Sequence, residues 1–187
     1  YLSTNMGILG DRPGSGKSFC ILERIISQPM LPHKKLPKKT LGNHIKIFQR
    51  ETIYLKANII VISHILINQW KMYINNFTTL KFKLVNKNQN LNLLVETILQ
   101  DDNEIILIID TIYNKFAEFI NINQNNLLFS RIVFDNADSL NIRNCAEIRS
   151  SFTWFITSKP ENLIYLNNIV YELHTEVDVD EDNYQDL

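Results

Sequence analysis

The chain has 187 residues, which fits one large domain, and 45% of them are apolar, so a sizeable core can form and wholesale disorder is excluded. Its 19 lysines and arginines against 20 aspartates and glutamates exclude a global positive field, so nucleic-acid binding would need a local patch. The two cysteines, Cys20 and Cys145, lie far apart, which argues against a disulfide framework or a zinc site and favours a reducing compartment.

Short β-branched runs alternate with helical patterns along most of the sequence. In chain order, the predicted strands are Met6–Leu9, Asn58–Ser63, Lys81–Val85, Glu104–Ile109, Ile132–Asp135 and Phe152–Thr157. Apolar residues with helical spacing predict helices over Ser18–Ser27, Ile65–Asn75 and Leu91–Leu99. Apolar strands separated by helices are typical of a parallel sheet covered on both faces. We therefore expect a doubly wound α/β fold with a mostly parallel sheet.

Two segments interrupt this alternation. Residues 29–43 contain three prolines and four lysines, which predicts an irregular basic loop whose lysines either contact phosphates or are simply solvated. Residues 176–187 are rich in carboxylates and predict an acidic tail or linker. We therefore expect one domain over residues 1–175. The apolar runs are too short to span a membrane and no secretory signal opens the sequence, so we expect an intracellular protein with no membrane association.

The segment GDRPGSGKS, from Gly10 to Ser18, joins a predicted strand to a predicted helix. Backbone N–H groups of such a loop can surround phosphate oxygens, and the helix adds unpaired donors at its positive end. Lys17 can reach the β- and γ-phosphates, and the Ser18 hydroxyl can ligate Mg²⁺. The predicted binding residues for ATP are Arg12, Pro13, Gly14, Ser15, Gly16, Lys17 and Ser18. The alternative is an ordinary glycine-rich turn, since Asp11 stands where the generic motif has glycine.

A second strand, Ile132–Asp135, ends in a carboxylate. Phosphate-loop proteins use such a carboxylate to hold Mg²⁺, and ligands of open α/β sheets bind at this carboxyl edge. We therefore predict that Asp135 and Ser18 form the metal site. The alternative is that Asp135 caps a helix that we expect to follow it.

Two further segments extend the pattern: ISHILINQW, from Ile62 to Trp70, and FTWFITSKPEN, from Phe152 to Asn162. With the two motifs above, they resemble in order the first RecA-like lobe of a superfamily 2 helicase. The closer resemblance is to Swi/Snf-type DNA translocases and to helicases and early transcription factor subunits of large DNA viruses. In those proteins Asp is the residue expected at position 11. The resemblance covers nearly the whole chain.

This resemblance implies a RecA-like, nucleic-acid-dependent ATPase lobe that uses ATP and Mg²⁺ and contacts DNA. It assigns the nucleic-acid contacts to His64, Thr157 and Ser158. It also implies a second RecA-like lobe in a longer chain, or subunits of a transcription complex, as partners. The place of action would be a viral factory, a virion or the host cytoplasm.

The sequence departs from that family at two positions. Asn136 occupies the water-activating position, where the family has Glu, and an amide cannot accept the proton of the attacking water near neutral pH. Lys159 replaces the Thr that ends motif III, which bears on the coupling between nucleotide and bound strand. In this family the arginine finger also comes from a second lobe, beyond the single lobe expected here.

Three interpretations of the function therefore stay open. The first is the ATP-binding lobe of a DNA helicase or translocase in viral transcription, with catalytic roles for Lys17 and Asn136. The second is a hydrolysis-deficient nucleotide-binding module, or a truncated remnant, that acts as an interaction protein. The third is a phosphate-loop kinase, which would need an acceptor pocket and a lid with catalytic arginines.

A few other residues carry simpler predictions. Trp70 and Tyr73 share a predicted helix face with isoleucines, which favours core packing over base stacking. We expect Cys20 to be a small core residue. We expect residues 110–113 to end a strand at the carboxyl edge of the sheet, with no assignable role.

Overall fold

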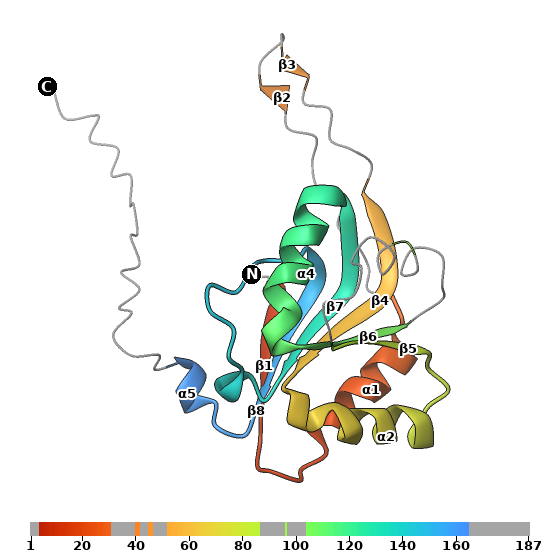
Figure 1. Cartoon of the computed structure of the whole chain (residues 1–187), viewed down its shortest axis with the longest axis vertical. Helices are drawn as coiled ribbons and strands as arrows, with labels where there is room; N and C mark the ends of the chain where they lie inside the picture. The colour runs from red at the N-terminus through yellow and green to blue at the C-terminus, as the bar shows by residue number, and fades with distance from the viewer. Residues whose placement is uncertain are drawn as a thin grey trace, which may run out of the picture.

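The structure, a computed structural model, describes residues 4–30, 52–86 and 104–164, together with residues 40–41, 45–46 and 96. The strands are β1 (Met6–Gly10), β2 (Thr40–Leu41), β3 (Ile45–Lys46), β4 (Ile53–Ile62), β5 (Phe82–Val85), β6 (Ile105–Ile109), β7 (Leu127–Asp135) and β8 (Ser150–Thr157). The helices are α1 (Lys17–Ser27), α2 (Ile67–Phe77), α4 (Asp110–Asn123) and α5 (Glu161–Ile164), and 3-10 turns cover His64–Leu66 and Ala137–Ser139 (Figure 1).

Six strands form one sheet in the order β1-β8-β7-β4-β6-β5, and every neighbouring pair is parallel. Each of the six predicted strands is present in this sheet. The register aligns the carboxyl ends of the strands, because Gly10 lies opposite Thr157, Asp135 opposite Ile156, and Ile62 opposite Ile109. The loops that follow β1, β8, β7, β4 and β6 therefore leave the sheet at one edge.

Apolar side chains cover both faces of the sheet because successive residues of each strand point to opposite sides. In β4, Ile60 and Ile62 pack beneath α1 and α2, whereas Ile59 and Val61 pack beneath α4. Figure 1 shows the same division, with α1 and α2 together on one side of the sheet and α4 on the other. This arrangement confirms the doubly wound α/β fold, and it is consistent with a RecA-like lobe.

The helix α4 differs from our expectation, since we expected residues 110–113 to end a strand. Asp110 instead begins α4, and its carboxylate accepts hydrogen bonds from the N–H groups of Thr111 (2.8 Å) and Asn141 (3.2 Å). An acceptor in the first helical turn satisfies N–H groups that have no partner within the helix. The residues after it bury a helical stripe that includes Ile112, Phe116 and Ile120.

The segment after β7 also differs from our expectation of a helix. Asn136 has a left-handed backbone, with φ of 60°, and it is followed by only a short 3-10 turn. The left-handed residue changes the direction of the chain after β7, and the single 3-10 turn Ala137–Ser139 takes the place of the expected helix. Of the predicted helix over 91–99 only residue 96 is described, and the acidic segment 176–187 lies outside the described residues. So does most of the basic loop, apart from an antiparallel pairing of β2 with β3.

Both cysteines are free and exposed, which corrects our expectation that Cys20 belongs to the core. The buried face of α1 consists of Ile21, Leu22 and Ile25, and Cys20 lies outside it. Within the described ranges, the helices are too short and too polar to cross a membrane.

Candidate nucleotide site

The loop between β1 and α1 has the backbone shape that its glycines favour. Gly14 and Gly16 have φ of 78° and 88°, which is the left-handed region that residues with a side chain rarely adopt. A Cβ atom added to either glycine would meet no other atom within 4 Å. The space beside the loop is therefore open at both glycines.

The loop offers several backbone donors toward a ligand. Within the described residues, the N–H groups of Gly14, Gly16, Lys17 and Ser18 have no hydrogen-bond partner, whereas that of Cys20 donates to the Gly16 carbonyl at 3.0 Å. The first N–H groups of a helix have no partner inside it, and they carry the positive end of the helix dipole. Donors of this kind bind phosphate oxygens.

The Lys17 side chain already lies within this loop. Its ammonium nitrogen donates to the carbonyl oxygens of Asp11 (2.6 Å) and Arg12 (2.7 Å) and lies 3.4 Å from the Ser15 hydroxyl oxygen. Neutral carbonyls are weaker partners for an ammonium group than an anionic phosphate oxygen. The ammonium group is thus held close to the open donors of the loop.

Asp11 belongs to the framework of the loop. Its carboxylate accepts a hydrogen bond from the Arg12 N–H at 2.7 Å, and its own N–H donates to the Thr157 carbonyl at 3.3 Å. The second bond joins the loop to the end of β8. Gly10 allows the segment after β8 to approach closely, since a Cβ atom on Gly10 would lie 3.0 Å from Pro160.

The second predicted metal ligand, Asp135, lies at the same edge of the sheet. Its strand, β7, does not pair with β1 directly, because β8 lies between them. The carboxyl group is 9% exposed, and its Oδ2 accepts a 2.8 Å hydrogen bond from the Trp70 indole N–H. Burial raises the pKa of Asp135, while the Trp70 bond, the Asn136 N–H and the charge of Lys17 lower it. Asp135 and the Lys17 loop therefore lie at the same carboxyl edge of the sheet, and the positive charge of Lys17 favours the charged form of Asp135.

Asn136, for which the resemblance predicts the water-activating position, follows Asp135 and is exposed. Its carbonyl accepts a hydrogen bond from the Ser139 N–H at 2.8 Å, which closes the 3-10 turn. Asparagine tolerates the left-handed backbone better than most residues, which explains its presence in this turn. The amide can orient water but cannot act as a base.

A partly buried hydrogen bond joins this turn to the end of β8. The Thr157 hydroxyl donates to Asp138 Oδ1 at 2.5 Å and accepts a hydrogen bond from the Lys159 N–H at 2.8 Å. Thr157 is 1% exposed, so its side chain faces Asp138 and not the solvent. Of the residues that the resemblance assigned to nucleic acid, His64 is exposed and Ser158 is partly exposed, and both directly follow strands at the carboxyl edge.

The prediction that Trp70 packs in the core is confirmed, since this side chain is 1% exposed. Sequence reasoning nevertheless missed its bond to Asp135 and the bond between Thr157 and Asp138. One signal was available: an indole N–H can only donate, so a buried tryptophan needs an acceptor. The sequence did not show which acceptor it would be.

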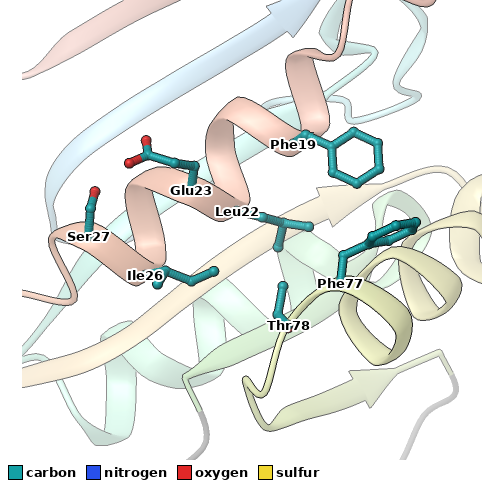
Figure 2. A pocket seen from close by; sticks show the side chains of 7 residues that line it. All are labelled: Phe19, Leu22, Glu23, Ile26, Ser27, Phe77 and Thr78. Carbon is teal, nitrogen blue, oxygen red and sulfur yellow. The ribbon is translucent and has the colours of Figure 1, made fainter.

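A hollow of about 300 Å³ lies between α1 and the end of α2 (Figure 2). The residues that line it are Phe19, Leu22, Glu23, Ile26, Ser27, Phe77 and Thr78. None of them belongs to the phosphate loop or to the strand ends, so the hollow is separate from the candidate nucleotide site.

The chemistry of the site fits Mg²⁺ bound together with a nucleotide. The described residues contain no cluster of three or more His, Cys, Asp or Glu side chains that could hold a metal by themselves. Mg²⁺ commonly uses one or two protein ligands and completes its coordination with phosphate oxygens and water. Ser18, whose hydroxyl has no partner among the described residues, and Asp135 are groups of the required kind.

No family model matches this chain, and no curated protein matches it. The fold and the geometry of the site are therefore the basis for the functional proposal.

Proposed function

We propose that this chain is the ATP-binding lobe of a DNA helicase or translocase, and that it belongs to a viral transcription apparatus. The observation that carries the proposal is the meeting of an open, glycine-shaped loop and the buried Asp135 carboxylate at one edge of a parallel sheet. Ligands of open α/β sheets bind at this edge. The helicase assignment, beyond nucleotide binding, rests on the resemblance of the four sequence motifs.

Each residue of the site has a distinct role in this proposal. The open N–H groups from Gly14 to Ser18 and the Lys17 ammonium bind the phosphates. Ser18 and Asp135 hold Mg²⁺, which neutralises charge on the phosphates and so favours their transfer to water. Asn136 orients a water molecule without taking its proton.

The same edge of the sheet supports the proposed contact with DNA. His64 follows β4 and Ser158 follows β8, and each is exposed or partly exposed. A nucleic-acid backbone that contacts both would lie across the carboxyl ends of the central strands, close to the nucleotide loop. The binding of nucleotide and the binding of DNA would then affect each other through the few residues that separate the two sites.

Protection against heat by Mg·ATP tests nucleotide binding. A ligand at 100 times its Kd stabilises the folded state by about 2.7 kcal/mol, which raises the Tm of a domain of this size by roughly 5–10 °C. We expect Lys17→Ala to abolish this rise. The matched control is Lys56→Ala, an exposed lysine in the amino-terminal half of β4. A native chain with no shift at millimolar Mg·ATP would refute the proposal.

A second function is favoured by one specific observation, the exposed Asn136 amide in the position of a general base. The chain would then bind Mg·ATP without turning it over and would act as an interaction module. Loss of a general base commonly lowers a rate by about 10²–10⁴-fold. Turnover in the presence of DNA separates this function from the first.

A further inference from the structure

Trp70 joins two parts of the molecule that are 65 positions apart in the sequence. Its indole N–H donates a 2.8 Å hydrogen bond to Asp135 Oδ2, and both side chains are buried, with exposed fractions of 1% and 9%. The bond ties the fourth residue of α2 to the last residue of β7. An indole N–H can only donate a hydrogen bond. It therefore binds one lone pair of the carboxylate and cannot take a proton from it.

The bond constrains the carboxylate in two ways. It fixes Oδ2, so that the side chain cannot rotate freely about its terminal torsion. It also favours the charged form of a group that burial would otherwise drive toward protonation. Among the described side chains, no other donates a hydrogen bond to this carboxylate.

The helix that carries Trp70 is itself fastened to the helix of the phosphate loop. Phe19, two residues after Lys17, packs against Tyr73 with ring centroids 4.6 Å apart and against Phe77 at 5.2 Å. Figure 2 shows Phe19 and Phe77 side by side between α1 and α2. The amino-terminal end of α2 directly follows the exposed turn His64–Leu66. A shift of α2 would therefore reach both Asp135 and α1.

We propose that Trp70 is a positioning residue for the metal-binding carboxylate of Asp135, and that through α2 it connects the His64 turn with the metal site. This inference rests on the proposed function, because it assigns a metal to Asp135. Hydrogen-bonding partners that orient a metal ligand typically contribute 10–100-fold to metal affinity. Trp70 is such a hydrogen-bonding partner, because its indole N–H donates to Asp135.

The test removes the indole donor and keeps its shape. Site-specific replacement of Trp70 by 3-benzothienylalanine exchanges the N–H for a sulfur atom of similar size, and Trp70→Phe is a second variant. The same replacement at Trp154, which packs in the same layer of the core, is the matched control. The readout is the Mg²⁺ concentration that gives half of the full thermal protection by ATP.

We expect this Mg²⁺ concentration to rise 10-fold or more in both Trp70 variants and to stay within 2-fold in the Trp154 control. Protection by ATP without Mg²⁺ should not change, which a general loss of packing would not allow.

A ligand-free readout tests the bond itself. In the ¹⁵N-labelled native chain, the indole N–H of Trp70 should exchange slowly with solvent and resonate as a hydrogen-bonded indole, and Asp135→Ala should shift this resonance and speed its exchange. If the native chain responds to Mg·ATP but the benzothienyl variant keeps its Mg²⁺ dependence within 2-fold, the positioning role is wrong while the proposed function stands. A native chain that does not respond to Mg·ATP overturns both.

Discussion

The Arg131 guanidinium donates a 2.6 Å hydrogen bond to the carbonyl oxygen of Gln28, although the two residues are 103 positions apart. Arg131 lies in the middle of the sheet on β7 and is 2% exposed, and Gln28 ends α1. Its other bonds go to Asn58 Oδ1 (3.1 Å) and the Ser130 hydroxyl oxygen (3.2 Å). A cation at the carboxyl end of a helix interacts favourably with the helix dipole. This residue therefore anchors the far end of the helix that begins at the phosphate loop.

The first prediction concerns the stability that Arg131 provides. Arg131→Ala leaves three acceptors unpaired and opens a cavity, so the free energy of unfolding should fall by about 2–4 kcal/mol. Arg131→Met leaves the same acceptors unpaired but fills most of the space, so it should lose less than the Ala variant. Urea denaturation measures both. The exposed Arg143→Ala is the control, with a change within about 0.5 kcal/mol. Equal losses in the Ala and Met variants would contradict the cavity argument.

The second prediction concerns the pH dependence of stability at Asp135. Burial raises its pKa in the folded state, so this group contributes stability below its unfolded pKa and loses that contribution as pH rises through the folded pKa. Asp135→Asn removes the charge and keeps an acceptor for Trp70. The variant should therefore have a higher Tm than the native chain at pH 7, and the difference should shrink as the pH falls toward 4.

The same variant separates stability from binding. Asp135→Asn should lose the Mg²⁺-dependent part of the protection by ATP, because an amide oxygen is a weaker ligand for Mg²⁺ than a carboxylate. A thermal scan over pH, with and without Mg·ATP, measures both effects. An Asn variant less stable than the native chain at pH 7 would show that the charge is well compensated in its site.

The third prediction concerns Asn136. If the missing general base limits the reaction, Asn136→Glu should raise DNA-dependent ATP turnover by about 10²-fold or more. Asn136→Gln is the matched control, since it has the same length and the same cost in the left-handed backbone but no base. A rate that rises equally in both variants would contradict the role of a base. A native chain that already turns over at the rate of the Glu variant would exclude the hydrolysis-deficient module.

The fourth prediction concerns the partly buried hydrogen bond between Thr157 and Asp138. Thr157→Val keeps the shape of the side chain but leaves Asp138 Oδ1 without its donor and the Lys159 N–H without its acceptor. The free energy of unfolding should fall by about 1–3 kcal/mol, and Thr157→Ser should restore most of it. Thr111→Val, an exposed threonine in the first turn of α4, should change it by less than about 0.5 kcal/mol.

The strands could be predicted because buried parallel strands are runs of β-branched and other apolar residues. The predicted starts of β4 and β7 were nevertheless late, at Asn58 and Ile132 instead of Ile53 and Leu127. Asn58 and Arg131 interrupt the apolar runs, yet they lie opposite each other in neighbouring strands and are hydrogen-bonded. Two polar residues that satisfy each other can be buried, but a single strand shows only one of them.

The residues of the candidate site also fall into a group that the sequence predicts and a group that it does not. The phosphate loop and Asp135 could be proposed from sequence because each belongs to a short, local pattern of strand, loop and helix. The partners of Asp135 and Thr157 could not, because they come from α2 and from the turn after β7. The helix α4 was missed because Asp110 directly follows a buried strand, and the change from strand to helix occurs without an intervening loop.

The position of β1 at the rim of the sheet affects the phosphate loop that it carries. Among the described strands, β1 pairs only with β8, and its alternate residues Met6 and Ile8 are exposed on one face of the sheet. Rim strands open more readily than central ones, and an opening here would carry the loop with it. A nucleotide bound to the loop would therefore also slow hydrogen exchange along β1, so that a strand with a single partner in the sheet gains a second constraint from the ligand.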